Sequence, residues 1–471
     1  MLILILAASA FTHLYNPVGF PEIFYDEGIY MQRSLGVIQG HGPQHDKFYD
    51  HPFFGQLFLG SILYSIGFPD SFISEQNSAA SLYLAPRVIM GLLAVFDTFL
   101  IYKISENRFG TKIGVFASLL FAVMPISWIT RRILLDSLLL PFVLLSILLA
   151  LYSQKSQHKT VMVFFSGVFL GIAILTKIPA FTMIPLIAYL VYSTQKSKKM
   201  LVFALVPAII IPMIWPAYSI SLDQFDYWQK GVLWQAQREN TGMHHTALSF
   251  GAIDPVLFGL GIAGFVYAGI RKNWFVIFWL VPFLIFLSVI GYTQYFHWII
   301  LLPIFCIAAS LLISDMGKKS KLENKLPVIV ILSLAVFGFM IQSMILGLNI
   351  SENQFESASF ASELARQEKI PILAGPQFLW IYSGVQGQDM RDYTAILYGK
   401  EPSNFILLAD PHYHLDYGRG VALAQIYNSS STVATFSSIK SNYNVYQYPY
   451  SSLGYNFDAG EIELKVFQRK D

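Results

Sequence analysis

The chain has 471 residues, of which 55% are hydrophobic and 13% are charged. Because soluble proteins carry about 25% charged residues, this composition excludes an ordinary soluble protein and predicts a polytopic membrane protein. The net charge of +2 provides no basic field for nucleic acid, and the single cysteine, Cys306, excludes an intramolecular disulfide and a cysteine-rich metal site.

Apolar stretches recur along the first three quarters of the chain. A run of about 18 or more apolar residues is long enough to cross a bilayer as a helix, so we expect about eleven transmembrane helices. Their expected positions are 1–16, 84–103, 112–130, 133–152, 161–178, 179–193, 200–219, 253–270, 274–292, 295–314 and 326–349.

Lys and Arg indicate the orientation of these helices. They are concentrated in every second connection, namely 103–112, 155–159, 196–199, 271–272 and 318–325. The positive-inside rule places these connections in the cytoplasm and the intervening segments on the extracytoplasmic face. We therefore expect a multi-pass integral membrane protein. Its outer tail without disulfides fits the plasma membrane of a prokaryote.

The chain is expected to divide into a membrane domain, 1–349, and a small soluble α/β domain, 350–471, on the outer face. The membrane domain contains two large outer loops, 17–83 and 220–252. In the first of them, the stretches Ile29–Gly40 and Phe53–Tyr64 are amphipathic, so we expect two helices that lie in the membrane interface. In the tail, the pattern predicts a helix at Ser351–Glu368 and strands at Pro371–Ala374 and Phe405–Ala409.

Two adjacent carboxylates, Asp26 and Glu27, follow the first apolar stretch. An ionised carboxylate is costly to keep close to hydrocarbon, so such residues indicate a functional site. A reaction at the membrane surface that needs a base would use a carboxylate at this place.

Basic residues also occur at the expected outer ends of the helices, where the positive-inside rule does not predict them. They are Arg87, Arg131, Arg132, Lys177, Lys230 and Arg238. Together they favour a site that grips a lipid-linked phosphate beside a base. The alternative is that single cations reach the outer headgroups. Asp136 follows Arg132 at i+4, so the two side chains can share a helix face.

Two histidine-containing segments are weaker candidates. The segment Gly40–Pro52 is rich in His and Asp and includes His51, but its spacing matches no tight metal-ligand pattern, so we interpret it as a solvated loop. His297 lies among aromatic residues near the outer end of a span, which is typical of an ordinary membrane-interface position.

The order of several short motifs resembles the C-type membrane glycosyltransferases (GT-C), in particular the dolichyl-phosphate-mannose protein mannosyltransferases and the aminoarabinose transferases of lipid A. The matching motifs are Tyr25-Asp26-Glu27-Gly28-Ile29-Tyr30, Tyr49-Asp50-His51-Pro52-Phe53, Ala85-Pro86-Arg87, Arg132-Ile133-Leu134-Leu135-Asp136 and Gly167–Pro179. The resemblance covers residues 1–220 well, 253–349 by topology, and the tail hardly at all.

This resemblance implies a transferase that moves a sugar, a hexose such as mannose, from a polyprenyl or dolichyl phosphate to an acceptor hydroxyl on the outer face. By similarity, Asp26 is the base, the reaction inverts the anomeric carbon, and Glu27 orients the acceptor or the base. The resemblance assigns substrate binding to Arg87, Arg132, Asp136, Lys177, Arg238, Tyr30 and His51. The implied acceptor is a protein, a lipid or a glycan.

Two departures from the family pattern concern the metal and the acceptor. The first outer loop lacks the Asp-x-Asp signature of metal-dependent oligosaccharyltransferases, so we assign no metal ligands, and a divalent metal stays an open alternative. The loop 220–252 is too short to hold the β-trefoil domain of eukaryotic O-mannosyltransferases. Two other functions compete with a transferase: a transporter or lipid-linked sugar flippase, and a receptor whose tail binds a partner.

Overall fold

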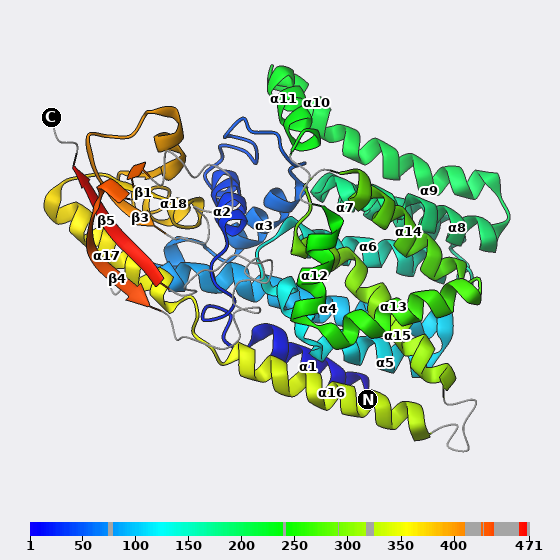
Figure 1. Ribbon diagram of the computed structural model, residues 1–471. Helices are drawn as coiled ribbons and strands as arrows, with labels where there is room; N and C mark the ends of the chain where they lie inside the picture. The colour runs from blue at the N-terminus through cyan, green and yellow to red at the C-terminus, as the bar shows by residue number, and fades with distance from the viewer. Residues whose placement is uncertain are drawn as a thin grey trace.

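The structure is a computed structural model that describes residues 1–73, 79–238, 242–290, 292–316, 325–409, 425–426, 428–437 and 461–468. Long helices form one elongated bundle, and a mixed α/β region lies at one end of it (Figure 1). Between the two lie α2 and α3, which belong to the expected first outer loop.

The helices of the membrane part and the helices that follow it have these bounds: α1 Leu2–Leu14, α2 Tyr25–Ile38, α3 Phe54–Ser65, α4 Ala79–Phe109, α5 Thr111–Val123, α6 Leu135–Tyr152, α7 Lys159–Thr176, α8 Ile184–Gln195, α9 Lys198–Ile210, α10 Ile214–Ser221, α11 Phe225–Ala236, α12 Met243–Ile253, α13 Pro255–Ile270, α14 Trp274–Val289, α15 Leu302–Met316, α16 Lys325–Leu346, α17 Glu352–Glu368 and α18 Pro376–Tyr382. Short 3-10 helices connect several of them: η1 Asp70–Phe72, η2 Pro125–Arg131, η3 Ile178–Met183, η4 Ile211–Met213, η5 Tyr295–Leu301 and η7 Tyr393–Tyr398.

In the described ranges, seven helices are long and apolar enough to cross a membrane, and nine if each of two bent pairs is one span. The predicted multi-pass membrane architecture is therefore confirmed. The count of eleven is not established by helix length. The two further apolar helices, α1 and α14, are shorter than a full span.

Proline accounts for the two bent pairs. Pro125 opens η2 directly after α5, and the two axes differ by 71°. Pro255 opens α13 after α12, with a bend of 118°. Proline lacks an N–H group and clashes with the preceding turn, so it starts a new helix more readily than it continues one.

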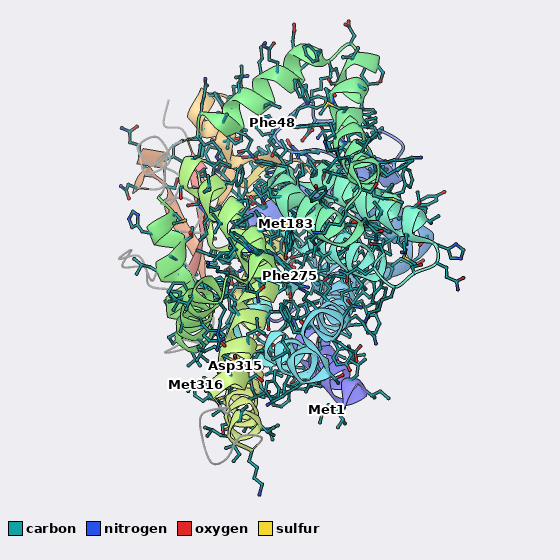
Figure 2. The ribbon with its side chains drawn as sticks, turned by 90° about the vertical axis from the view of Figure 1, so that its right-hand side faces the viewer. Met1, Phe48, Met183, Phe275, Asp315 and Met316 are labelled. Atoms are coloured by element: carbon teal, nitrogen blue, oxygen red, sulfur yellow. The ribbon has the colours of Figure 1, made fainter. Side chains whose placement is uncertain are left out.

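The bundle has an inner and an outer layer. The spans Leu135–Tyr152 and Tyr295–Met316 are each 83% buried, so they form its centre. The spans Lys198–Ser221 and Lys325–Leu346 are only 22% and 28% buried, and apart from lysines at their first residues most of their exposed side chains are apolar. In the view along the bundle, side chains fill the space between the helices (Figure 2). This distribution is that expected of a bundle surrounded by lipid.

Both helices expected in the first outer loop are present, because α2 and α3 coincide with the two amphipathic stretches. The loop between them, 39–53, is exposed at 39–41 and 45–48, as expected of a solvated loop, but its last part, 49–53, is largely buried. Buried Arg33 pairs with Asp46 and Asp50, each at 2.8 Å, and draws the loop onto α2. The expected second outer loop is largely helical, since it contains α11 and most of α12.

The tail contains α17, α18 and a five-stranded mixed sheet with strand order β2-β1-β3-β5-β4. The strands are β1 Ile372–Ala374, β2 Met390–Asp392, β3 Asn404–Ala409, β4 Ser431–Ser437 and β5 Glu461–Gln468. β1 pairs in parallel with β2 and β3, whereas β5 pairs antiparallel with β3 and β4. The expected tail helix and both expected strands correspond to α17, β1 and β3.

The α/β region is in direct contact with α2. A Cβ atom at Gly28 would lie 2.3 Å from the backbone of Pro376. Helix α18 therefore comes so close to α2 that only glycine, which has no Cβ, fits at position 28. Tyr83 of α4 donates a hydrogen bond to the carbonyl of Gln377 at 2.7 Å and accepts one from Trp380 at 3.1 Å. These contacts join α2 and α4 to the tail.

We predict that Gly28→Ala lowers the melting temperature of the purified protein, because overpacking a tight contact costs about 1–3 kcal/mol. The matched control is Gly259→Ala in α13, where an added Cβ meets no atom within 4 Å. Alanine is the better helix former, so this control should keep or raise the melting temperature. Equal melting temperatures for the two variants would contradict the close contact between α18 and α2.

Candidate active site

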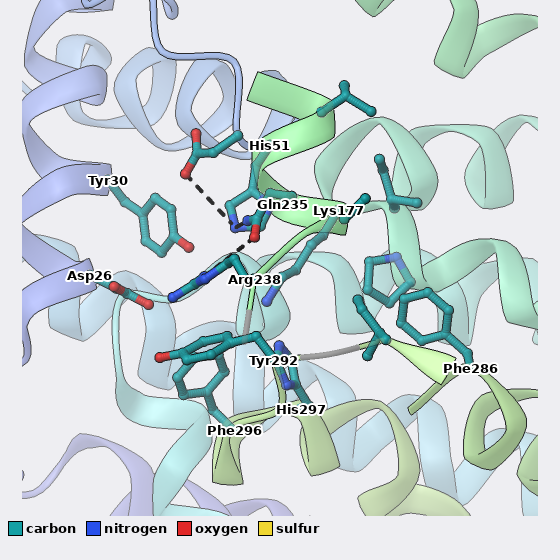
Figure 3. A pocket seen from close by; sticks show the side chains of 16 residues that line it. Asp26, Tyr30, His51, Lys177, Gln235, Arg238, Phe286, Tyr292, Phe296 and His297 are labelled. Carbon is teal, nitrogen blue, oxygen red and sulfur yellow. Dashed lines mark hydrogen bonds and ion pairs between the residues drawn. The ribbon is translucent and has the colours of Figure 1, made fainter. Parts of the chain in front are cut away.

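A pocket of about 270 Å³ lies where α2, the loop 39–53, the end of α11 and the segment before η5 meet. Figure 3 shows its polar side chains pointing toward a common space. Five of the nine sequence-predicted site residues line it: Asp26, Tyr30, His51, Lys177 and Arg238. The pocket also contains residues to which the sequence assigned no role in the site: Asp50, Gln235, Tyr292, Phe296 and His297.

Asp26 lies in the first turn of α2, and its carboxylate faces the pocket (Figure 3). It makes no hydrogen bond or ion pair with any residue of the described ranges, although Lys177 and Arg238 act on it electrostatically. Burial raises the pKa of the Asp26 carboxyl to about 6, and the two cations oppose this shift. A base with a pKa close to neutral is well suited to accept a proton in the physiological range.

Two cations face Asp26. Lys177 caps the C-terminal end of α7 and pairs with buried Asp136 of α6 at 2.6 Å. Arg238 follows α11, and its guanidinium lies over the ring of Tyr292, 3.4 Å from its centroid. In the part of the chain that the structure describes, Arg238 has no carboxylate within ion-pair distance, so its charge is available to an anion.

The opposite wall of the pocket is apolar. It is formed by Ile178 and Pro179 of η3, Val232 of α11, and Phe286 and Ile290 at the end of α14. These residues come from elements that carry exposed hydrophobic side chains, including Phe181 and Val289. The pocket therefore combines a charged side with an apolar side that continues toward the lipid-facing surface.

Glu27, the neighbour of Asp26, does not line the pocket. Its carboxylate is fully buried and accepts hydrogen bonds from Arg87 at 2.8 and 3.2 Å and from the backbone N–H groups of Phe24 at 2.8 Å and Ile133 at 3.0 Å. Arg132 lies 3.7 Å from Glu27 and also pairs with Glu22. We call these four side chains, Glu22, Glu27, Arg87 and Arg132, the buried ion cluster.

The possible pairing of Arg132 with Asp136 is wrong. Helix α6 begins only at Leu135, and Arg132 has an extended backbone, so the two residues do not share a helix face. Arg132 joins the buried ion cluster, whereas Asp136 points toward Lys177.

His297, interpreted from the sequence as an ordinary interface residue, has a further place in the structure. It lines the pocket, and its Nδ1 accepts a hydrogen bond from the backbone N–H of Gln294 at 2.9 Å. In the sequence its aromatic neighbours are typical of the membrane interface, so they gave no indication of a pocket. No sequence signal pointed to Gln235, because an uncharged polar residue in an outer loop is unremarkable.

The described residues contain no group of three His, Cys, Asp or Glu side chains placed to hold a metal ion. In the pocket, Asp50 is engaged by Arg33 at 2.8 Å, which leaves it less free to act as a ligand. The donor set thus does not fit a protein-bound divalent ion, and the chemistry considered below uses none.

The chain is similar to known proteins in part of its sequence and in its fold. Residues 75–219 match the family model described as dolichyl-phosphate-mannose-protein mannosyltransferase. The crystal structure of ArnT from Cupriavidus metallidurans bound to undecaprenyl phosphate has a TM-score of 0.60 and 13% identity, and the match covers 98% of this chain and 97% of that chain. No curated protein sequence matches the chain.

An archaeal relative has the same architecture. The apo oligosaccharyltransferase of Archaeoglobus fulgidus gives a TM-score of 0.59 at 11% identity, over 94% of this chain and 74% of that chain. The predicted resemblance to C-type membrane glycosyltransferases is confirmed, and the chain has their fold.

We predict that Glu27→Gln and Asp26→Asn affect stability in opposite ways. Glu27→Gln removes the carboxylate that pairs with buried Arg87, whereas Arg132 keeps its pair with Glu22. Breaking a buried ion pair by removing one partner costs about 3–5 kcal/mol. Asp26 differs, because its pKa of about 6 lies above the ordinary value. Its ionised form is disfavoured in the fold, and this cost develops as the pH rises toward the raised pKa.

At near-neutral pH, Glu27→Gln should therefore lower the melting temperature, while Asp26→Asn should keep or raise it. Thermal unfolding of the two variants in the same detergent measures this difference. A larger loss of stability for Asp26→Asn than for Glu27→Gln would contradict the assignment of Glu27 to the buried ion cluster.

Proposed function

We propose that this protein is a membrane glycosyltransferase that moves a sugar from a polyprenyl-phosphate carrier to an acceptor hydroxyl, with Asp26 as the general base. One observation carries the proposal: a single pocket holds a carboxylate without an ion-pair partner in the described ranges and two cations on one side, and an apolar wall on the other. A lipid-linked sugar phosphate has the complementary parts, namely a charged phosphate and a hydrocarbon chain.

In the proposed reaction, the acceptor oxygen attacks the anomeric carbon while its proton passes to Asp26. The bond between the anomeric carbon and the phosphate oxygen breaks, and polyprenyl phosphate leaves with the electron pair. A single displacement of this kind inverts the configuration at the anomeric carbon. The transition state resembles an oxocarbenium ion, so negative charge develops on the leaving phosphate.

Lys177 and Arg238 are the proposed partners of that phosphate. Both act on Asp26 electrostatically, so they share its side of the pocket. In a partly desolvated site, positioned cations stabilise developing negative charge more strongly than water does. Asp136 contributes indirectly, because its carboxylate holds the Lys177 ammonium at 2.6 Å.

The apolar wall is the proposed contact for the first isoprene units of the carrier. Ile178 of η3, Phe286 of α14 and Ile290, which follows α14, belong to this wall. The matched ArnT structure was determined with undecaprenyl phosphate, a ligand with both a phosphate and an isoprenoid chain. This shared fold supports a lipid-phosphate donor for the present chain.

Tyr30 and His51 are proposed substrate-binding residues, since both line the pocket beside Asp26. Glu27, Arg87 and Arg132 are proposed to position α2 rather than to touch substrate, because the buried ion cluster engages them. Mannose or another hexose is the proposed sugar, in keeping with the matched family, and the acceptor is the hydroxyl of a protein, lipid or glycan.

The proposed topology has eleven membrane crossings, with α1 and α14 counted as spans. The basic connections near Lys103 and Lys196 lie at the end of α4 and α8, away from the α/β region (Figure 1). If they are cytoplasmic, the pocket and the tail face the outside, as the positive-inside rule requires. A prokaryotic plasma membrane is the proposed location.

We predict that Asp26→Asn abolishes transfer and leaves carrier binding largely intact. Loss of a general base typically costs about 10²–10⁴-fold in rate, whereas the phosphate-binding cations stay in place. The measurement follows release of polyprenyl phosphate from radiolabelled polyprenyl-phosphate hexoses by purified protein, with crude lipid and peptide extracts as acceptors. Full transfer by Asp26→Asn would refute the assignment of the base; movement of the carrier between leaflets without release would favour a flippase.

We also predict an acidic limb in the pH profile of transfer. Asp26 must be deprotonated to act as a base, and its pKa is about 6. The rate should therefore be constant near neutral pH and fall by about tenfold per pH unit well below the pKa. Initial rates in overlapping buffers measure this profile, with the melting temperature followed in parallel. A rate that stays level to strongly acidic pH would contradict a catalytic role for Asp26.

A further inference from the structure

Gln235, in the last turn of α11, contacts two other residues of the pocket. Its Oε1 accepts a hydrogen bond from Arg238 Nη1 at 3.3 Å. Its Nε2 lies 3.1 Å from His51 Nε2, on the loop 39–53. Figure 3 shows the three side chains in a row, with Gln235 in the middle.

The direction of these hydrogen bonds follows from the donors and acceptors present. Arg238 can only donate, so the carbonyl oxygen of Gln235 faces it and the amide nitrogen faces His51. An amide nitrogen can only donate, so the His51 nitrogen that it meets must be an unprotonated acceptor. Burial and the cations Lys177, Arg33 and Arg238 agree with this, since they hold the pKa of His51 well below its usual range.

Helix α11 itself is closely docked on the same loop. A Cβ atom at Gly231 would lie 2.3 Å from the carbonyl oxygen of Tyr49, which indicates direct backbone contact. Tyr49 also donates a hydrogen bond to Gln224 at 2.7 Å, and the rings of Phe48 and Trp234 lie 5.1 Å apart. The loop 39–53 thus fixes α11, and Gln235 extends this fixation to the pocket.

Arg238 depends on Gln235 for its direction. Its other contacts in the described ranges are with the faces of aromatic rings, at 3.4 Å from Tyr292 and 4.8 Å from Trp234. Stacking on ring faces keeps the guanidinium group parallel to the rings, but it does not determine in which direction the N–H groups point within that plane. A directed hydrogen bond supplies that selection.

We propose that Gln235 is a positioning residue for the transfer: its amide links His51 to Arg238 and holds the Arg238 guanidinium toward the leaving phosphate. This inference rests on the proposed function and adds a residue that acts through Arg238 without touching the reacting atoms. An isolated guanidinium would have to be ordered when the donor binds, and prior ordering by Gln235 removes that cost.

The test is a double-mutant cycle of Gln235→Met and Arg238→Ala, read out as the affinity for undecaprenyl phosphate without sugar. Methionine keeps the length of the side chain and removes both hydrogen bonds. The substitution removes the prior ordering of one guanidinium and no contact with the ligand itself, so Gln235→Met should weaken binding by about three- to tenfold. In the Arg238→Ala background, Gln235→Met should have no further effect, since its influence passes through Arg238.

Gln237→Met, an exposed residue at the end of the same helix, is the matched control and should bind undecaprenyl phosphate like the wild type. Melting temperatures of all variants are measured alongside, because a merely structural role would lower stability without selective loss of phosphate binding. Additive effects in the cycle, or unchanged affinity in Gln235→Met, would overturn the inference.

Failure of the proposed function is recognised separately. If wild-type protein neither binds undecaprenyl phosphate nor releases it from any donor, the transferase assignment fails before a Gln235 variant is compared. If wild type transfers sugar and depends on Asp26 and Arg238, but the cycle is additive, the role of Gln235 alone is wrong.

Discussion

The buried ion cluster is the interaction on which the arrangement of the site depends. Glu27 lies in the first turn of α2, and its carboxylate receives both a guanidinium from α4 and backbone N–H groups from Phe24 and Ile133. Burying charge in a low-dielectric interior is costly unless every group is paired. Because Glu27 is engaged by Arg87 of α4 and by the N–H groups of Phe24 and Ile133 at the same time, the cluster fixes the start of α2 against the spans.

Fixing Glu27 also fixes Asp26. Adjacent residues of a helix point in different directions, so a carboxylate held inward at Glu27 turns its neighbour toward the pocket. The same helix is held from its other side by α18, which approaches Gly28 at backbone distance. One short segment of α2 thereby connects the membrane bundle, the pocket and the α/β region.

The pocket shows the opposite electrostatic design. The buried ion cluster pairs its charges, whereas Asp26 and Arg238 lack ion-pair partners among the described residues, and burial raises the pKa of the Asp26 carboxyl. Charges kept unpaired in a partly buried site reduce stability but are ready to act on a substrate. On the proposed function, Glu27 serves stability and Asp26 serves catalysis, and for this reason Glu27→Gln and Asp26→Asn are expected to behave differently.

The membrane class, the apolar helices, the two helices of the first loop, the resemblance to C-type glycosyltransferases and a short set of candidate charges could be predicted from the sequence. Hydrophobic runs are local signals, and ionisable residues near lipid are rare enough to stand out. Which charges meet became known from the three-dimensional structure. Glu27 and Arg87 are 60 residues apart, and Gln235 and His51 are 184 apart. Their pairing depends on how distant helices pack, and no spacing along the chain encodes it.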